Sequence, residues 1–368
     1  MTMAGACEIQ RAGLSGGMFP LISSTSAGGK AGVSRREALR LLGLGGATAL
    51  LASSGGLRAA ESAAVAAGVK LSGQPGFYRF KIGAHEALAF NDGGFAAPFD
   101  QSPYAAGVAD GSAQIAETLK KAYLPPDKVQ VPFNVLLVRI GTEWVLIDTG
   151  AGSAFGAAAG KLRAQLAAAG LGPGQISAVL ISHAHGDHIG GLLDDDTKQP
   201  VFKNATHYIG RREFEFWMGA DPDLGRLPLG AEVARQMIAG ARSVLGALKD
   251  KFQLVAPGEK LIDGLEIVDA PGHTPGHLAF LVSSGDEQLL HFVDAAHHHA
   301  LTFAHPEWAF AYDAQPSAAA ATRKALLDRA AADRLRVFGA HMPFPALGHV
   351  KPIAGGRYEY VIEPWLPG

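Results

Sequence analysis

Three histidines and one aspartate lie within six consecutive residues, in the segment His183-Ala184-His185-Gly186-Asp187-His188. Imidazole nitrogens and carboxylate oxygens are together typical ligands of zinc and similar divalent metals. So many ionisable side chains directly after an apolar stretch argue against a solvated polar loop. The spacing therefore predicts a metal site in this segment.

A short buried β-strand is predicted directly before these residues, at positions 178–181. The segment therefore leaves the end of a strand, where side chains two residues apart point the same way. His183 and His185 can face one ion, while Asp187 and His188, on the turn into a following helix, can face a second. One loop thus predicts ligands for two ions.

Four more polar residues lie at the end of a predicted strand or in a turn between two strands. They are Asp148 at the end of residues 144–148, His273 between residues 265–268 and 278–282, Asp294 after residues 289–293, and His341 after residues 334–339.

The predicted elements come in a repeated order, with a run of strands and then a helix in each half of the chain. The first half has strands at 77–84, 86–90, 133–140 and 144–148, and the second has a helix at 317–332 before its last strand at 334–339. Residues 91–131 predict an irregular arm with a helix near 113–122. The order favours two packed sheets with helices outside, a four-layer sandwich.

Taken together, these segments resemble the metallo-β-lactamase-fold hydrolases. The His-x-His-x-Asp-His string is similar to the signature of that family. The short segments that contain Asp148, His273, Asp294 and His341 occur in the family's order within residues 130–350. The resemblance implies an α+β protein with the four-layer αβ/βα sandwich of the metallo-β-lactamase fold.

The resemblance also assigns the ligands. One metal would be held by His183, His185 and His273, the other by Asp187, His188 and His341, with Asp294 bridging both and Asp148 supporting the metal histidines from outside. It implies two divalent ions, first of all Zn²⁺, with Mn²⁺, Co²⁺ and Fe²⁺ as alternatives. Because two cations that share a water lower its pKa and yield hydroxide near neutral pH, Asp187 and Asp294 are the expected catalytic residues.

Within the family, residues 148–156, 213–217 and 341–349 resemble the organophosphate hydrolases of the methyl parathion hydrolase group. This resemblance favours hydrolysis of neutral esters, above all phosphotriesters with aryl leaving groups. Phe155 and Trp217 would then be apolar walls of the substrate pocket, and a place in the core is the alternative for each.

Two other functions remain open at this point. One is a lactonase acting on acyl-homoserine or other lactones, and the other is an exported zinc-binding protein without turnover. The triplet His297-His298-His299 either reaches the mouth of the site or lies on a solvated loop.

Residues 1–66 predict a targeting segment rather than part of the fold. Arg35 and Arg36 precede an uncharged apolar run that is too short to span a bilayer. The arrangement resembles a twin-arginine export signal. We therefore expect cleavage, a periplasmic or secreted protein, and a single hydrolase domain in residues 67–368.

Composition limits the partners. The formal net charge is −2, so the chain lacks the excess of basic residues that would indicate nucleic-acid binding. Cys7 is the single cysteine, which excludes both a disulfide within one chain and a metal site built on several thiolates. We expect a small-molecule substrate, no nucleic-acid partner and no membrane association after processing, and a homodimer is compatible with the family.

Overall fold

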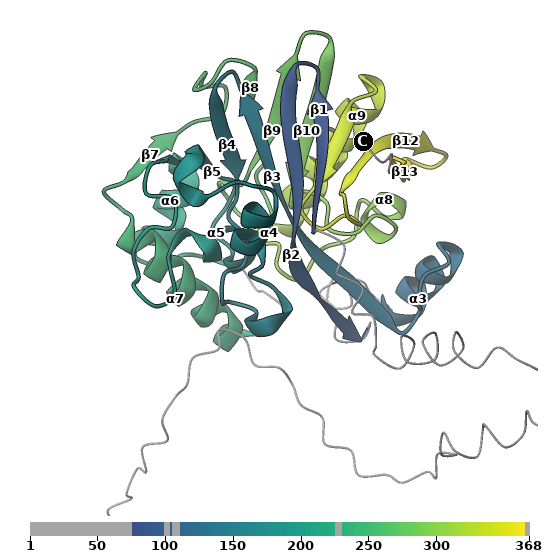
Figure 1. Cartoon of the computed structure of the whole chain (residues 1–368). Helices are drawn as coiled ribbons and strands as arrows, with labels where there is room; N and C mark the ends of the chain where they lie inside the picture. Colours follow the sequence, from purple (N-terminus) through teal and green to yellow (C-terminus); the bar gives the residue numbers. More distant parts are fainter. Residues whose placement is uncertain (1–75, 99–103, 105–110, 225–229, 365–368) are drawn as a thin grey trace, which may run out of the picture. The chain divides into compact units, whose positions relative to one another are not determined.

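The computed structural model describes residues 76–98, 104, 111–224 and 230–364, and the expected targeting segment at 1–66 lies outside them. In this part of the chain two sheets lie between outer helices, so the predicted four-layer α+β sandwich is confirmed (Figure 1). None of the described helices is long and apolar enough to cross a membrane.

The first sheet has seven strands in chain order within the described residues, antiparallel from the first to the fourth and parallel from there on. They are β1 (Phe77–Ile82), β2 (His85–Pro98), β3 (Lys128–Ile140), β4 (Glu143–Ile147), β5 (Ile176–Ile181), β6 (Thr206–Gly210) and β7 (Phe252–Val255). Its outer helices are α4 (Leu162–Ala168), α5 (Gly186–Ile189), α6 (Arg211–Met218) and α7 (Ala231–Ala247) (Figure 1).

The second sheet has six strands in the order β13-β12-β11-β10-β9-β8, again counted over the described residues. They are β8 (Leu265–Asp269), β9 (Leu278–Ser284), β10 (Glu287–Val293), β11 (Arg336–Gly339), β12 (Leu347–Ile353) and β13 (Arg357–Ile362). The helices α8 (Leu301–Ala304) and α9 (Pro316–Ala332) belong to this half (Figure 1).

Strand β3 shows how the sequence specifies this layering. Successive side chains of a strand point to opposite faces. Leu136 and Val138 pack in the cluster shared by the two sheets, whereas Val135 and Leu137 pack in the cluster that includes residues of α4 and α7. Because residues 135–138 are buried on both faces, this part of the strand is continuously apolar, whereas the half before it alternates.

The expected irregular arm is instead an extension of the first sheet. Strand β2 continues to Pro98 and pairs with β3 back to Lys128, with helix α3 (Gly111–Lys121) between them. The pairing shifts register between Asn91 and Gly93, and the glycine has a φ of 124° that other residues rarely adopt. The continuation of β2 cannot be predicted from its sequence, because glycine and alanine, which are frequent there, do not favour strands.

Candidate metal centre

All seven predicted ligands meet where strands of both sheets end. The loop after β5 and the short helix α5 that follows it carry four of them, the β8–β9 loop carries His273, and Asp294 and His341 follow β10 and β11. They form two groups, and within each group one donor atom per residue lies within 4.8 Å of all the others. The first group is His183, His185 and His273, and the second is Asp187, His188, Asp294 and His341.

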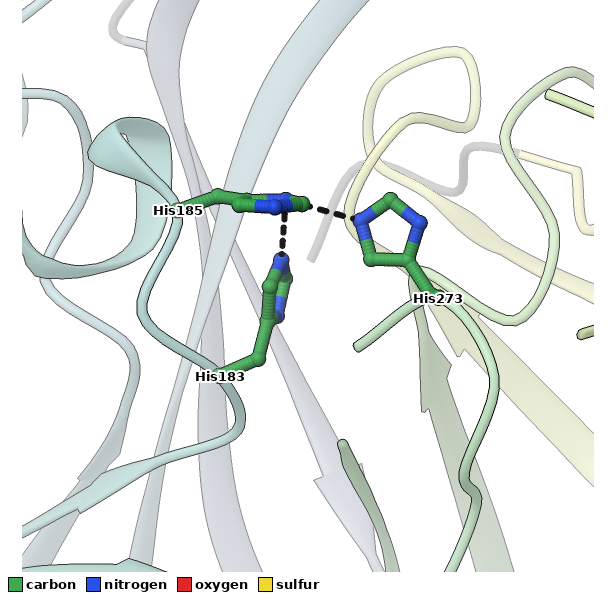
Figure 2. Close-up of side chains that lie close together, drawn as sticks. All are labelled: His183, His185 and His273. Carbon is green, nitrogen blue, oxygen red and sulfur yellow. Dashed lines mark hydrogen bonds between the residues drawn. The ribbon is translucent and has the colours of Figure 1, made fainter. Parts of the chain in front are cut away.

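The first group consists of imidazoles alone. The Nδ1 atom of His185 lies 3.1 Å from Nε2 of His183 and 2.9 Å from Nε2 of His273. Figure 2 shows the ring of His185 joined by dashed lines to each of the other two. Burial, reinforced by neighbouring imidazoles, lowers the pKa of all three, that of His273 to about 3. Three neutral imidazoles with nitrogens facing one another are a fitting donor set for zinc.

The second group mixes carboxylates with imidazoles. Nε2 of His188 lies 3.4 Å from Oδ2 of Asp187 and 3.4 Å from Oδ1 of Asp294, and Nε2 of His341 lies 2.9 Å from Oδ2 of Asp294. Burial alone would lower the pKa values of both histidines, but the adjoining carboxylates, Asp294 first, raise them.

Asp294 lies between the two groups, as expected of a bridging ligand. Its Oδ2 atom is 3.3 Å from Nε2 of His273 and 3.8 Å from Nε2 of His183, in addition to its contact with His341. Within the described chain its Oδ1 atom and Nε2 of His188 are buried without a hydrogen bond. Buried polar atoms normally have partners, so these orphaned atoms fit metal ligands.

Asp148 holds the ligand loop in the way that the sequence analysis expects. Its carboxylate accepts hydrogen bonds from the backbone N–H and the hydroxyl of Ser182, each at 2.8 Å, and contacts Nδ1 of His188 at 2.8 Å. With Nδ1 engaged in this way, Nε2 of His188 is directed to the ligand position. The backbone of Asp148 has a φ of 63°, which is uncommon outside glycine.

Two further residues support the ligands from outside: Asp313, which the sequence does not indicate, and His277, for which the sequence favours an ordinary polar group near a turn over such a role. Asp313 is fully buried, contacts Nδ1 of His273 at 2.9 Å and pairs with the buried Arg323 at 3.4 Å. His277 accepts a hydrogen bond from the backbone N–H of Asp294 at 3.2 Å through Nε2. His277 belongs to a recognised segment and was detectable there, whereas no spacing rule connects Asp313 with His273.

Glu213 is a third supporting residue and connects two ligand loops. This buried carboxylate accepts hydrogen bonds from the backbone N–H groups of Ala184 and Gly276, at 2.9 and 3.1 Å, and from the hydroxyl of Thr274 at 2.6 Å. Burial raises the pKa of Glu213, and these donors act in the opposite direction.

An apolar cavity lies over the metal ligands, and Phe155 is part of its wall. Its other lining residues include Phe95, Phe133, Met237, Phe310 and Tyr312, together with Asp187, His273, Asp294 and His341. The stacked rings of Phe95 and Phe155 have centroids 6.0 Å apart, so the extended β2–β3 arm forms one side of the cavity.

Trp217 does not line this cavity, which corrects the sequence-based expectation. The side chain is fully buried, and its Nε1–H donates a 2.6 Å hydrogen bond to Glu213, four residues earlier on α6. The indole also packs edge-to-face against His185, with centroids 5.7 Å apart. Residues four apart lie on one face of a helix, so the residue that anchors Glu213 is directed into the core.

The histidine triplet is not a solvated loop at its first two positions. His297 is fully buried and stacks on Phe310 with centroids 3.7 Å apart. His298 is buried and accepts backbone hydrogen bonds from Ala300 and Leu301 at 3.1 and 3.2 Å through Nδ1. His299 is half-buried and lines an open groove together with residues of the β2–β3 arm.

Curated relatives match part of the chain. The N-acyl homoserine lactonase AttM of Azorhizobium caulinodans is 34% identical over 139 residues, which cover 36% of this chain and 46% of the relative. The protein of the same name from Agrobacterium fabrum is 30% identical over 134 residues, with the same two coverages. The chain thus spans about half the length of these relatives.

Solved structures match over nearly their whole length. AidC, described as a dizinc quorum-quenching lactonase in complex with a product, is 31% identical, with a TM-score of 0.75 and coverage of 79% of this chain and 99% of AidC. AbOPH, described as a hydrolase in the beta lactamase superfamily, is 29% identical, with a TM-score of 0.71 and coverage of 80% and 99%.

A model of the metallo-beta-lactamase superfamily matches residues 130–341, which contain every predicted ligand. The donor set has the composition expected of a metal-dependent hydrolase of that superfamily. By this match, and by the similarity to AidC, the chain belongs to the metallo-beta-lactamase superfamily.

Proposed function

We propose that the protein is a dinuclear metal hydrolase, with zinc as its principal metal, that opens the ring of N-acyl homoserine lactones. The observation that carries this proposal is the position of Asp294 between two complete donor groups, under an apolar cavity. Two divalent ions bound there supply a water of lowered pKa and a Lewis acid for the carbonyl oxygen of the substrate.

The comparisons support a lactone over the phosphotriester that the sequence analysis favours first. The relatives whose names state a substrate are N-acyl homoserine lactonases, and AidC is described as a lactonase. The cavity is consistent with this class, because Phe95, Phe155 and Met237 offer apolar surface for an acyl chain beside the ligands.

Tyr312 is the side chain best placed to assist the reaction apart from the ligands. It lines the cavity with Asp187, and burial, with that carboxylate, raises the pKa of its phenol to about 12. The phenol therefore stays protonated at neutral pH and can donate a hydrogen bond to the oxygen on which negative charge develops.

Asp187 stays ionised, and this suits a ligand that also orients the attacking water. Burial opposes its ionisation, but the adjoining His188 and His341 lower its pKa to about 2. An anionic carboxylate at the cavity wall can bind a cation and accept a hydrogen bond at the same time.

A substrate panel on the zinc-loaded protein tests the proposal. We expect kcat/KM for N-acyl homoserine lactones to exceed that for an aryl phosphotriester by at least ~100-fold, or about 2.7 kcal/mol of transition-state binding. A higher value for the phosphotriester would instead support the organophosphate hydrolase. Two bound zinc ions with no turnover of lactone, aryl ester or phosphotriester would support the non-catalytic zinc-binding protein.

We also propose that residues 1–66 direct export by the twin-arginine route and are then removed, leaving one hydrolase domain in the periplasm or outside the cell. The paired Arg35 and Arg36 before an apolar run support this proposal. Expression with both arginines changed to lysine should leave the protein uncleaved in the cytoplasm, as N-terminal sequencing of the fractions would show.

A further inference from the structure

His297 is a fully buried imidazole whose two ring nitrogens make no hydrogen bond within the described chain. Leaving a buried donor or acceptor without a partner costs about 1–3 kcal/mol. Its stacking on Phe310 explains the position of the ring but satisfies neither nitrogen. The predicted ligand set does not use this residue either, so a buried polar group beside the site is left unexplained.

The distances around His297 are those of a metal ligand. Two donors that each lie ~2.1 Å from one tetrahedral ion are ~3.4 Å apart. Nε2 of His297 is 3.5 Å from Oδ2 of Asp294, and the same oxygen is 3.3 Å from Nε2 of the predicted ligand His273. One donor atom from each of these three residues lies within 4.8 Å of the other two.

Within the described residues, the surroundings of the His297 ring offer its nitrogens no partner other than the metal site. His297 does not line the cavity over the ligands, so its side chain does not meet a substrate there. Its ring lies parallel to that of His341, with centroids 5.7 Å apart, and 4.7 Å from the ring of His273. It is therefore enclosed by Phe310 and by predicted ligands from both groups.

We propose that His297 is an eighth protein ligand of the dinuclear centre and binds the ion that it shares with His273 and Asp294. This inference rests on the proposed dinuclear centre, but not on the lactone specificity. It gives the chain a donor beyond the seven that the family resemblance assigns, and it explains why a buried imidazole is kept without a hydrogen bond.

The test counts the histidine ligands without using turnover. In the Co²⁺-loaded protein, each coordinated imidazole whose second nitrogen carries a proton contributes one strongly shifted N–H resonance. We expect six such signals, from His297 and from the five histidines of the two predicted groups, rather than five. Five signals in the wild-type protein would overturn the proposal.

The variant His297→Phe should remove one of these resonances and weaken binding of one Co²⁺ ion by at least roughly 10- to 100-fold in a chelator competition. Phenylalanine keeps the stacked ring on Phe310 and removes the buried polar nitrogens, so the metal-free variant should unfold at a temperature no lower than the wild type. A melting curve of the metal-free form checks this.

His299→Phe is the matched control, because it changes a half-buried imidazole of the same triplet that contacts no predicted ligand in the described structure. It should leave the resonances and both affinities unchanged. If His297→Phe keeps every resonance, even with weaker binding, His297 acts only through its contact with Asp294 and the proposal fails. The test measures metal coordination and not turnover. A protein that shows all six signals but hydrolyses no lactone would therefore contradict the lactonase function and leave the His297 proposal intact.

Discussion

The two donor groups differ in charge and in how they hold their protons. The first group has three imidazoles whose pKa values burial lowers, so the ion meets uncharged donors. The second has Asp187 and Asp294 among its imidazoles, and these carboxylates raise the pKa values of His188 and His341. Without metal, therefore, the second group is a set of buried ion pairs, whereas the first is neutral.

This difference indicates that the groups play unequal parts in folding and metal uptake. Ion pairs balance the charge of the buried carboxylates in the second group before a metal arrives, but the metal must then displace protons. The first group has no charge to balance and depends on the metal, or on neighbouring hydrogen-bond partners, to fix its rings. Asp294 is the residue that both groups share.

Asp294→Ala should produce the largest effect, because it removes the carboxylate between the groups. We expect loss of at least one ion per chain and a fall in lactone kcat/KM of more than ~1,000-fold, or about 4 kcal/mol. Metal analysis of the purified variant, beside the kinetics, checks both. Asp294→Asn is the conservative control, since it keeps one oxygen donor, and it should retain more metal. Wild-type metal content in the alanine variant would contradict the shared role.

Binding of the two ions should depend differently on pH. The carboxylates raise the pKa values of His188 and His341 and so favour their protonated forms in the metal-free protein, and an ion that enters the second group displaces the protons they hold. Affinity there should increase by about tenfold per pH unit for each proton released. Burial lowers the pKa values of the first group and so favours neutral imidazoles, which have no proton for the metal to displace, so its affinity should depend much less on pH.

Calorimetric titration with Zn²⁺ in buffers of different ionisation enthalpy measures these protons for each binding step. One step should release protons between about pH 6 and pH 7 and the other should not. Equal proton release in the two binding steps would show that the two groups hold the same number of protons in the metal-free protein.

Asp313→Asn should weaken binding at the first group selectively. The amide oxygen can still accept a hydrogen bond from Nδ1 of His273, but the negative charge beside the ring is lost. We expect a roughly 10- to 100-fold lower affinity for one ion. Asp148→Asn is the matched change at the second group, where the carboxylate contacts His188. Chelator competition should show that the two variants weaken the binding of different ions. If both variants weaken the binding of the same ion, the two groups do not bind their ions independently.

Sequence reasoning succeeds where the chemistry is local. His183 to His188 follow one strand without interruption, so the period of the strand and the turn after it specify which way the side chains point. The other ligands are found through their segments, each at the end of a strand. The layers follow from the same apolar patterns, which the second half of strand β3 and strand β5 show.

Sequence reasoning fails where the role of a side chain depends on a partner far away in the sequence or on which face of a helix it occupies. Asp313 lies 40 residues from His273, and no periodicity links them. Trp217 is apolar and close to the site, and only its hydrogen bond to Glu213 shows that it belongs to the core rather than the cavity. The continuation of β2 escapes notice because its pairing with β3 supplies the stability that glycine and alanine lack.

Tyr312→Phe should produce the smallest effect and tests whether catalysis depends on the metal groups alone. The phenol lines the cavity, and its raised pKa keeps the proton available for a developing oxyanion. Losing one such donor should lower lactone kcat by about tenfold, or about 1.4 kcal/mol, with both ions retained. Tyr360→Phe is the control, because it removes a buried hydroxyl that has no hydrogen bond within the described chain and lies on β13, outside the cavity wall. If the two variants have the same kcat as the wild type, the two ions and Asp187 suffice for the chemistry, and Tyr312 only shapes the cavity.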